Sequence, residues 1–307
     1  MTSTGSVATA RAALGRVGVW LPPAMLDITT PEAERDAVVA AEDLGYGSLW
    51  TGDRIGGKEI FAHLGLLLAA TRRLVVGAGV ANIWARHPAA MQGGAATLAQ
   101  AYPGRFVLGL GVSARAVVER AGGQTYDDRP LRRMRGYLDD MDAAAAAPPH
   151  PSTPFARVLG ALGPRMHDLA RERADGVHPF LMPVEQTARA RKAVGPDKLV
   201  VPHQMVVLAS NRSDVRRLVT EYVGPVLTAK QGHYATNFVR LGFDADEIGG
   251  DRFVDAVLAW GDEAAVARRV REHLAAGADH VLVQPVAPDL RTATEQFARL
   301  APLLREV

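Results

Sequence analysis

The sequence predicts an α/β fold, a (β/α)8 TIM barrel, and three observations support this prediction. Eight short apolar runs alternate with helix-like stretches along the chain, which is the order of parallel strands joined by crossover helices. The length of 307 residues is normal for a single barrel of this kind. No stretch has the composition of a linker between domains. We therefore expect one domain over residues 14–307, preceded by a flexible N-terminal tail over residues 1–13, which is small and polar.

The first four strands are apolar runs of the kind found in parallel strands that are covered on both faces. They are expected at residues 17–21, 48–51, 74–80 and 106–110. The helices between them have clear start signals: Thr30 is a good N-cap, and Pro88 opens a helix where its missing N–H costs nothing. Residues 71–113 form one right-handed βαβ unit, and Gly109 and Gly111 crowd the C-terminal end of its second strand.

The second half of the chain has a looser pattern. Strands are expected at residues 155–162, 175–180, 199–209 and 280–284. Between the last two strands, residues 224–250 are irregular, and helices are expected at 252–260 and 262–275. The irregular stretch is the candidate insertion after strand seven, and long insertions on a barrel usually lie over its active face.

Composition narrows the class of protein. The chain has no cysteine, which excludes disulfides, thiolate catalysis and Cys-based metal sites, and fits a cytoplasmic protein. The formal net charge of +2 gives no reason to expect a nucleic-acid partner. No apolar run is long enough to cross a bilayer, so no membrane partner is expected. The histidines lack the spacing of a zinc motif, so no metal site is expected.

Two features point to ligand contact from the residues alone. The Gly163-Pro164 turn starts a helix, whose free N–H groups and positive dipole end attract an anion, and the glycine lets a ligand approach the backbone. The alternative for this turn is an ordinary tight connection. The glycines at the strand ends, Gly77, Gly79 and Gly109 among them, either accommodate a ligand or make room for a neighbour. Gly109-Leu-Gly-Val-Ser is no dinucleotide fingerprint, because the third glycine is missing.

Several segments, in order along the chain, carry a family resemblance. They are Leu49-Trp-Thr-Gly-Asp, Gly77-Ala-Gly-Val, His87-Pro-Ala, Tyr102-Pro-Gly-Arg-Phe-Val-Leu-Gly-Leu-Gly-Val-Ser, Ala161-Leu-Gly-Pro, Arg173-Ala-Asp-Gly-Val and Ala276-Gly-Ala-Asp-His-Val-Leu-Val-Gln. As an ordered set, which covers nearly the whole chain, they resemble the bacterial luciferase-like monooxygenase superfamily. The alanine-rich, actinobacterial-looking composition makes the chain look most similar to the branch that uses the deazaflavin F420.

The resemblance implies a cofactor, F420 or alternatively FMN, whose isoalloxazine-like ring lies in the barrel mouth. It implies a non-proline cis peptide at Gly79-Val80, with the ring resting on Val80 and Ala81. The residues implied to hold the cofactor are Gly79, Val80 and Ala81 behind the ring, Gly111, Val112 and Ser113 at the ribityl chain, and Ala161, Leu162, Gly163 and Pro164 at the phosphate.

Asp53 and His178 are the catalytic candidates. Many F420 enzymes of this superfamily have Asp-His at the point where this chain has Asp53-Arg54, and that histidine touches the deazaflavin ring. Arg54 cannot serve as a base, so it either binds an anion or a ring carbonyl, or forms an exposed loop ion pair. His178 ends strand six, and His87 precedes a helix; each is either a proton donor or a hydrogen-bonded structural histidine.

We therefore expect an F420-dependent oxidoreductase that transfers a hydride between the cofactor and a small organic substrate. The alternatives are an FMN-dependent monooxygenase on the same fold and an F420-binding protein without turnover. An unrelated aldolase-type barrel is disfavoured, because no lysine lies at the end of a predicted strand. Dimerisation is common in proteins that look like this, and the alanine-rich helices suit a close homodimer interface. His233, Tyr234 and Arg240, in the insertion, are expected to shape the substrate pocket.

Overall fold

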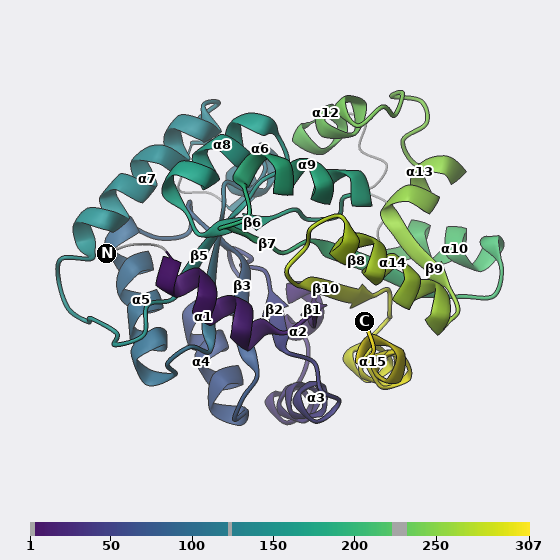
Figure 1. Ribbon diagram of the computed structural model, residues 1–307, viewed down its shortest axis with the longest axis horizontal. Coiled ribbons are helices and arrows are strands. Elements are labelled where there is room, and N and C mark those ends of the chain that lie inside the picture. The colour runs from purple at the N-terminus through teal and green to yellow at the C-terminus, as the bar shows by residue number, and fades with distance from the viewer. Residues whose placement is uncertain (1–3, 122–124, 223–231) are drawn as a thin grey trace.

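The computed structural model describes residues 4–121, 125–222 and 232–307. Figure 1 shows the strands at the centre of the molecule with helices around them. The strands are β1 (Val17–Leu21), β2 (Ser48–Thr51), β3 (Val75–Asn82), β4 (Phe106–Gly111), β5 (Ala156–Gly160), β6 (Gly176–His178), β7 (Leu199–Val200), β8 (His203–Leu208), β9 (Leu258–Gly261) and β10 (Val281–Pro285).

The helices lie mostly between consecutive strands. They are α1 (Thr4–Leu14), α2 (Pro23–Asp27), α3 (Pro31–Asp43), α4 (Ile60–Ala70), α5 (Pro88–Ala101), α6 (Arg115–Ala121), α7 (Pro130–Ala144), α8 (Pro164–Arg173), α9 (Val184–Val194), α10 (Arg212–Tyr222), α12 (His233–Arg240), α13 (Asp251–Val257), α14 (Glu263–Ala275) and α15 (Leu290–Leu304). No helix in the described part of the chain is long and apolar enough to span a bilayer.

The strands form one parallel sheet in the order β7-β6-β5-β4-β3-β2-β1-β10-β8-β9. The sheet closes into a barrel because β7 and β8 are two halves of one extended stretch, the predicted seventh strand. The first half pairs with β6 and the second with β10. The break falls at Pro202, which has no N–H to donate but whose carbonyl accepts from Leu282 N–H at 2.9 Å. The predicted (β/α)8 barrel is confirmed.

One predicted helix is wrong at its end. Residues 252–260 were expected to be helical throughout, but α13 stops at Val257 and Leu258–Gly261 form strand β9, which pairs in parallel with the free side of β8. A four-residue apolar stretch fits a helix end or a short strand equally well. The pairing partner, about fifty residues earlier in the chain, decides between them. The insertion lies between β8 and β9, and its residues 224–231 fall outside the described residues.

The predicted flexible tail is also corrected. Residues 4–14 form helix α1, and Val7, Ala10 and Leu14 on one face of it are buried. They pack against barrel-interior side chains such as Trp50 and Leu282. The buried face of this short, alanine-rich helix is only weakly apolar, so the sequence shows no clear amphipathic pattern. Its packing against the strand ends is visible only in the structure. Figure 1 shows α1 lying across the strands.

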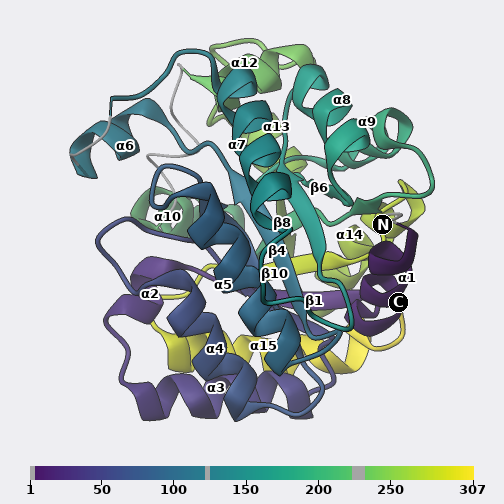
Figure 2. The same cartoon turned by 90° about the vertical axis from the view of Figure 1, so that its left-hand side faces the viewer.

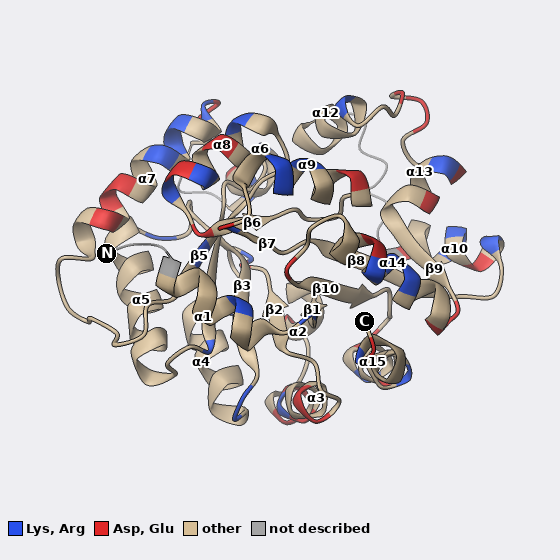
Figure 3. Cartoon of the chain, in the orientation of Figure 1, with Lys and Arg blue, Asp and Glu red and all other residues tan. Residues whose placement is uncertain are grey.

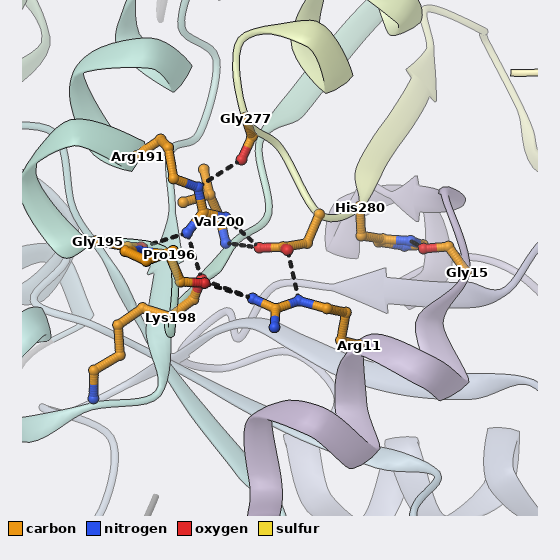
Figure 4. A network of polar contacts seen from close by, with 10 residues as sticks. Arg11, Gly15, Arg191, Gly195, Pro196, Lys198, Val200, Gly277 and His280 are labelled. Atoms are coloured by element: carbon orange, nitrogen blue, oxygen red, sulfur yellow. Dashed lines mark hydrogen bonds and ion pairs between the residues drawn. The ribbon is translucent and has the colours of Figure 1, made fainter. Parts of the chain in front are cut away.

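An ion-pair cluster fastens α1 to the barrel (Figure 4). Asp279, just before β10, accepts hydrogen bonds from Arg11 of α1 at 2.7 Å, from Arg191 of α9 at 2.6 Å and from Val200 N–H at 2.8 Å. Beside it, His280 bonds Gly15 O at 3.0 Å through Nδ1. The end of the barrel at which the strands begin is therefore covered and closed, and the opposite end is left for a ligand.

Candidate active site

A cavity of about 390 Å³ opens at the C-terminal ends of strands β1 to β6. Ten of the twelve predicted site residues line it, so the fold brings together segments that are far apart in the sequence. They are Asp53, Gly79, Val80, Gly111, Val112, Ser113, Ala161, Leu162, Gly163 and His178. Pro164 lies beside it, in the lining of an adjoining cavity. Ala81 is wholly buried in the core and does not line this cavity, so its expected contact with the ring stays a prediction.

The peptide bond between Gly79 and Val80 is cis, which confirms the prediction. The Val80 side chain lies among the ends of the neighbouring strands, where glycines leave space for it. A Cβ on Gly111 would stand 2.2 Å from Val80 Cγ2, and one on Gly109 would stand 3.1 Å from Val80 Cγ1. The pairing of β3 with β4 shifts register between Ala78 and Ala81. The glycines at these strand ends therefore make room for a neighbour, and that neighbour is itself part of the cavity wall.

Asp53 supports this wall and is fully engaged in doing so. Its N–H donates to Val80 O at 3.0 Å, and its Oδ2 accepts from Asn82 N–H at 3.0 Å and from Arg86 at 2.7 Å. Its side chain is only 3% exposed. The hydrogen bonds of Asp53 therefore suit a residue that positions the end of β3 around Val80.

Arg54 lies away from the cavity. Its guanidinium pairs with Asp27, and its side chain is 52% exposed. Of the alternatives for this residue, the structure contains the exposed loop ion pair. His87 is also structural: it is the N-cap of α5, and its Nδ1 accepts from Ala89 N–H at 3.2 Å.

His178 is one of the titratable residues that line the cavity. Its Nδ1 lies 2.7 Å from Val201 O, which can only accept, so Nδ1 carries the proton. Its Nε2 is buried and has no hydrogen-bond partner among the described residues. Burial lowers the pKa of His178 to about 4. At neutral pH the imidazole is therefore uncharged, and its buried Nε2 is an acceptor without a partner among the described residues, on a side chain that belongs to the cavity lining.

The residues and the fold agree with a match to a known family. Residues 12–280 match the luciferase-like monooxygenase family. The chain belongs to this family. A flavin-type cofactor, F420 or FMN, is typical of luciferase-like proteins, and the resemblance seen in the sequence is confirmed at this level.

Two curated relatives of this luciferase-like chain are similar over part of their length. A putative coenzyme F420-dependent oxidoreductase of Mycobacterium tuberculosis is 31% identical over 180 residues, which are 49% of this chain and 51% of the relative. A 5,10-methylenetetrahydromethanopterin reductase of Archaeoglobus fulgidus is 30% identical over 158 residues, 46% of each chain. The matched part thus spans about half the length of these relatives.

Solved structures share the fold. An F420-dependent secondary alcohol dehydrogenase in complex with an F420–acetone adduct has a TM-score of 0.76 at 14% identity, covering 95% of this chain and 99% of that one. An F420-dependent tetrahydromethanopterin reductase of Methanopyrus kandleri has a TM-score of 0.70 at 20% identity, covering 94% and 99%. The oxygenating constituent of 3,6-diketocamphane monooxygenase of Pseudomonas putida, in complex with FMN, has a TM-score of 0.67 at 17% identity, covering 96% and 98%.

The luciferase-like cavity also has aromatic walls that the sequence analysis missed. Trp20 at the end of β1 donates from Nε1 to Gly79 O at 3.2 Å, and Phe180 lies edge-on to it at 5.0 Å. Both follow or end predicted strands, so the rule that strand ends form the site would have found them. Tyr126 belongs to the loop after β4, which has no sequence pattern, and it stacks on Trp84 at 5.2 Å between ring centres.

The insertion contributes to the same cavity. His233 and Tyr234, at the start of α12, line it, whereas Arg240 lines the adjoining cavity, and their expected role in shaping a substrate pocket stays a prediction. Figure 2 shows α12 at the upper end of the molecule, opposite α3. In the described part of the chain no three or more His, Asp or Glu side chains gather closely enough to hold a metal ion.

Proposed function

We propose that this luciferase-like protein is an F420-dependent oxidoreductase that moves a hydride between the deazaflavin and a small organic substrate. The observation that supports it most is the pairing of two features across one cavity. The first feature is Val80, which follows the cis peptide and lines the cavity. The second is neutral His178, whose Nε2 has no partner among the described residues. The names of the curated relatives also favour F420.

The cavity fits such a cofactor through its own atoms. Val80 fills the space beside the glycine at the tip of β4 and itself lines the cavity, so a flat ring can lie against the Val80 side chain. Trp20 and Asp53 hold the Gly79-Val80 segment from two sides, through the Gly79 carbonyl and the Val80 carbonyl. When bound, the deazaflavin supplies a carbon that accepts or donates a hydride.

His178 supplies the proton chemistry in this proposal. Nε2 accepts the hydroxyl proton of an alcohol substrate as its carbon loses a hydride, and returns that proton when a carbonyl is reduced. Nδ1–H stays on Val201 O throughout and keeps the ring oriented. Trp20, Phe180 and the apolar side chains of the wall exclude water, so the hydride is transferred to the substrate alone.

A binding titration followed by a turnover assay tests the proposal. The purified protein is titrated with F420 and with FMN, and then assayed with a panel of alcohols and with ketones plus reduced F420. We expect saturable F420 binding and substrate-dependent change in F420 absorbance. FMN binding with oxygen consumption would instead indicate the monooxygenase alternative, and F420 binding without turnover on the panel would indicate a binding protein.

We also propose a homodimer that forms through the outer faces of α4 and α5. Neither helix has a charged residue, and Figure 3 shows both ribbons without blue or red. Leu66 of α4 is 70% exposed although it is a large apolar side chain. Light scattering after size exclusion should give a dimer mass for the wild type and a monomer mass for Leu66→Glu. A monomeric wild type would contradict this proposal.

A further inference from the structure

A second cavity of about 780 Å³ adjoins the proposed ring cavity. The two share lining residues at the turn that leads into α8, where Leu162 and Gly163 face both, and at His233 of the insertion. The second cavity is about twice the volume of the first. It lies directly beyond the turn that the sequence analysis assigned to the cofactor phosphate, so any part of a bound cofactor that continues past a phosphate there enters it.

Five arginines and one carboxylate line this second cavity, which we call the arginine annex. The arginines come from three separate places: the start of α7, the start of α8 and the end of α12. They are Arg129, Arg132, Arg135, Arg165 and Arg240, and the carboxylate is Asp128. Figure 3 shows basic residues on α7, α8 and α12 along the same upper side of the molecule. Positively charged side chains from three separate helices therefore line the same cavity.

Three of these arginines form no ion pair with a carboxylate of the described residues, although Asp127 accepts a hydrogen bond from Arg129 N–H at 2.9 Å and so lies beside that arginine. Arg132 pairs with Asp127, Arg135 pairs with Glu172, and the lining carboxylate, Asp128, pairs with Arg115 outside the annex. Across the described residues no carboxylate lies within ion-pair distance of Arg129, Arg165 or Arg240. Of the arginines elsewhere among the described residues, some pair with Asp or Glu, as Arg216 and Arg291 do, and others form no ion pair.

The position of Arg240 links the annex to the α8 turn. A Cβ on Gly163 would stand 3.1 Å from Arg240 Nη1, so the glycine lets the guanidinium lie against the start of α8. Gly163 is also the N-cap of that helix and offers no side chain to its N–H groups. The positive end of the α8 dipole and the Arg240 guanidinium therefore lie next to each other where the turn meets the annex.

We propose that the arginine annex binds a polyanionic cofactor tail, a chain of several carboxylates that continues beyond the phosphate. This inference rests on the proposed function, because the tail is held only if the ring occupies the neighbouring cavity. FMN ends in a single phosphate monoester, whereas F420 continues through its phosphate into a carboxylate chain. Three unpaired arginines and 780 Å³ exceed what one phosphate needs, so the annex is the part of the chain that distinguishes the two cofactors.

The experiment compares deazaflavins that differ only in the tail. The dissociation constants of F420 with its full tail, of the same deazaflavin cut after the phosphate, and of the deazaflavin without phosphate are measured by fluorescence titration at low and high salt. The variants are Arg129→Gln/Arg165→Gln/Arg240→Gln and a control with the same charge change at exposed sites outside the annex, Arg35→Gln/Arg72→Gln/Arg271→Gln. No turnover is needed for the readout.

We expect the full tail to improve wild-type affinity about tenfold or more over the form cut after the phosphate, since each exposed charge pair contributes up to about fivefold. The annex variant should lose this advantage while its affinity for the deazaflavin without phosphate stays as in the wild type, and the control should keep the advantage. High salt should shrink it in the wild type.

Two results would overturn the inference while the proposed function stands: equal wild-type affinity for the full and shortened tails, or an annex variant that weakens all three forms alike. If the form without phosphate also fails to bind, the proposed function fails and takes the inference with it. A loss of tail dependence in the control as well would show a general charge effect and would contradict a specific annex.

Discussion

The two ends of this barrel differ in how their polar and charged side chains are paired. At the end where the strands begin, α1 covers the interior, and Asp279 joins Arg11, Arg191 and a backbone N–H in one cluster (Figure 4). At the other end the side chains leave two adjoining cavities, one with apolar and aromatic walls and one with unpaired arginines. At the closed end the charged groups of this cluster bind one another. Among the described residues, the open end leaves His178 Nε2 without a hydrogen-bond partner and three guanidinium groups without an ion pair.

The difference shows where stability and function reside in this molecule. Buried polar groups that satisfy each other contribute to a unique, stable fold, and those left without partners cost stability unless a ligand completes them. Substitutions at the closed end should therefore change unfolding and leave binding alone. Substitutions at the open end should do the reverse.

The largest effect is expected from His178→Asn at the open end. Loss of a general base lowers a rate by about 10²- to 10⁴-fold, or roughly 3–5 kcal/mol of barrier. Turnover with F420 would be measured across pH, with F420 affinity as the control. The wild-type rate should fall only as the pH drops through about 4, where His178 becomes protonated. An unchanged rate in the variant would remove His178 from the mechanism.

His280 tests the closed end through pH. Burial lowers its pKa to about 4, below the value of 6.5 for an exposed histidine. Below pH 6.5 the unfolded chain takes up a proton that the folded chain refuses, so stability present at neutral pH is lost as the pH falls toward 4. The shift corresponds to roughly 3 kcal/mol. Urea unfolding at pH 7 and pH 4.5 should show a smaller acid loss for His280→Gln than for the wild type. An equal loss in both would contradict the assignment.

Asp279→Asn should break the cluster that holds α1. It leaves Arg11 and Arg191 facing a neutral amide, at a cost of about 2–3 kcal/mol in the free energy of unfolding. The matched control is Glu295→Gln, whose ion pair with Arg291 is exposed and should contribute less than about 1 kcal/mol. Denaturant melts give both values. F420 affinity should be the same in the two variants. A lower affinity in Asp279→Asn alone would contradict the prediction that the closed end does not affect binding.

Gly111→Ala should disturb the open end without unfolding the protein. The new methyl group would stand 2.2 Å from Val80 Cγ2, so Val80 must move against the proposed ring site. We expect F420 affinity to fall about tenfold, which is about 1.4 kcal/mol. Gly93→Ala is the control, since nothing lies within 4 Å of its added methyl. A larger loss of affinity in the Gly93 variant would contradict the geometry.

The smallest effect is expected from Arg54→Gln. Its ion pair with Asp27 is half exposed, so its removal should change the free energy of unfolding by less than about 1 kcal/mol. Because the side chain is absent from the cavity lining, turnover and F420 affinity should stay as in the wild type. A clear loss of turnover would return Arg54 to the site.

Much of the site was predictable because parallel strands deliver their C-terminal ends to one place. Asp53, Val80, Gly111, Gly163 and His178 all follow or end a recognisable strand, and the structure gathers them around one cavity. Their bonding was not predictable. The sequence made Asp53 a catalytic candidate, and the structure gives it three backbone and side-chain partners that lie about thirty residues away.

The misses share a physical cause. Ala81, expected beside the ring, is buried in the core next to a register shift between β3 and β4, which a local pattern does not indicate. Helix α1 was taken for a tail because a face of Val7, Ala10 and Leu14 is weakly apolar by itself. Strand β9 was assigned to a helix because four residues are too few to show a strand or helix period. Each of these features is identified only by its contacts with residues far away in the sequence.

The sequence by itself predicted the barrel and most of its strands and helices, because these follow from local apolar patterns and from glycines and prolines at fixed positions, and its motifs predicted the family through their resemblance. The tertiary structure alone decided which end is closed, which side chain shares each hydrogen bond, and that arginines of α7, α8 and α12 meet in one annex. Those properties depend on distances between residues far apart in the chain, and a local pattern contains no such distances.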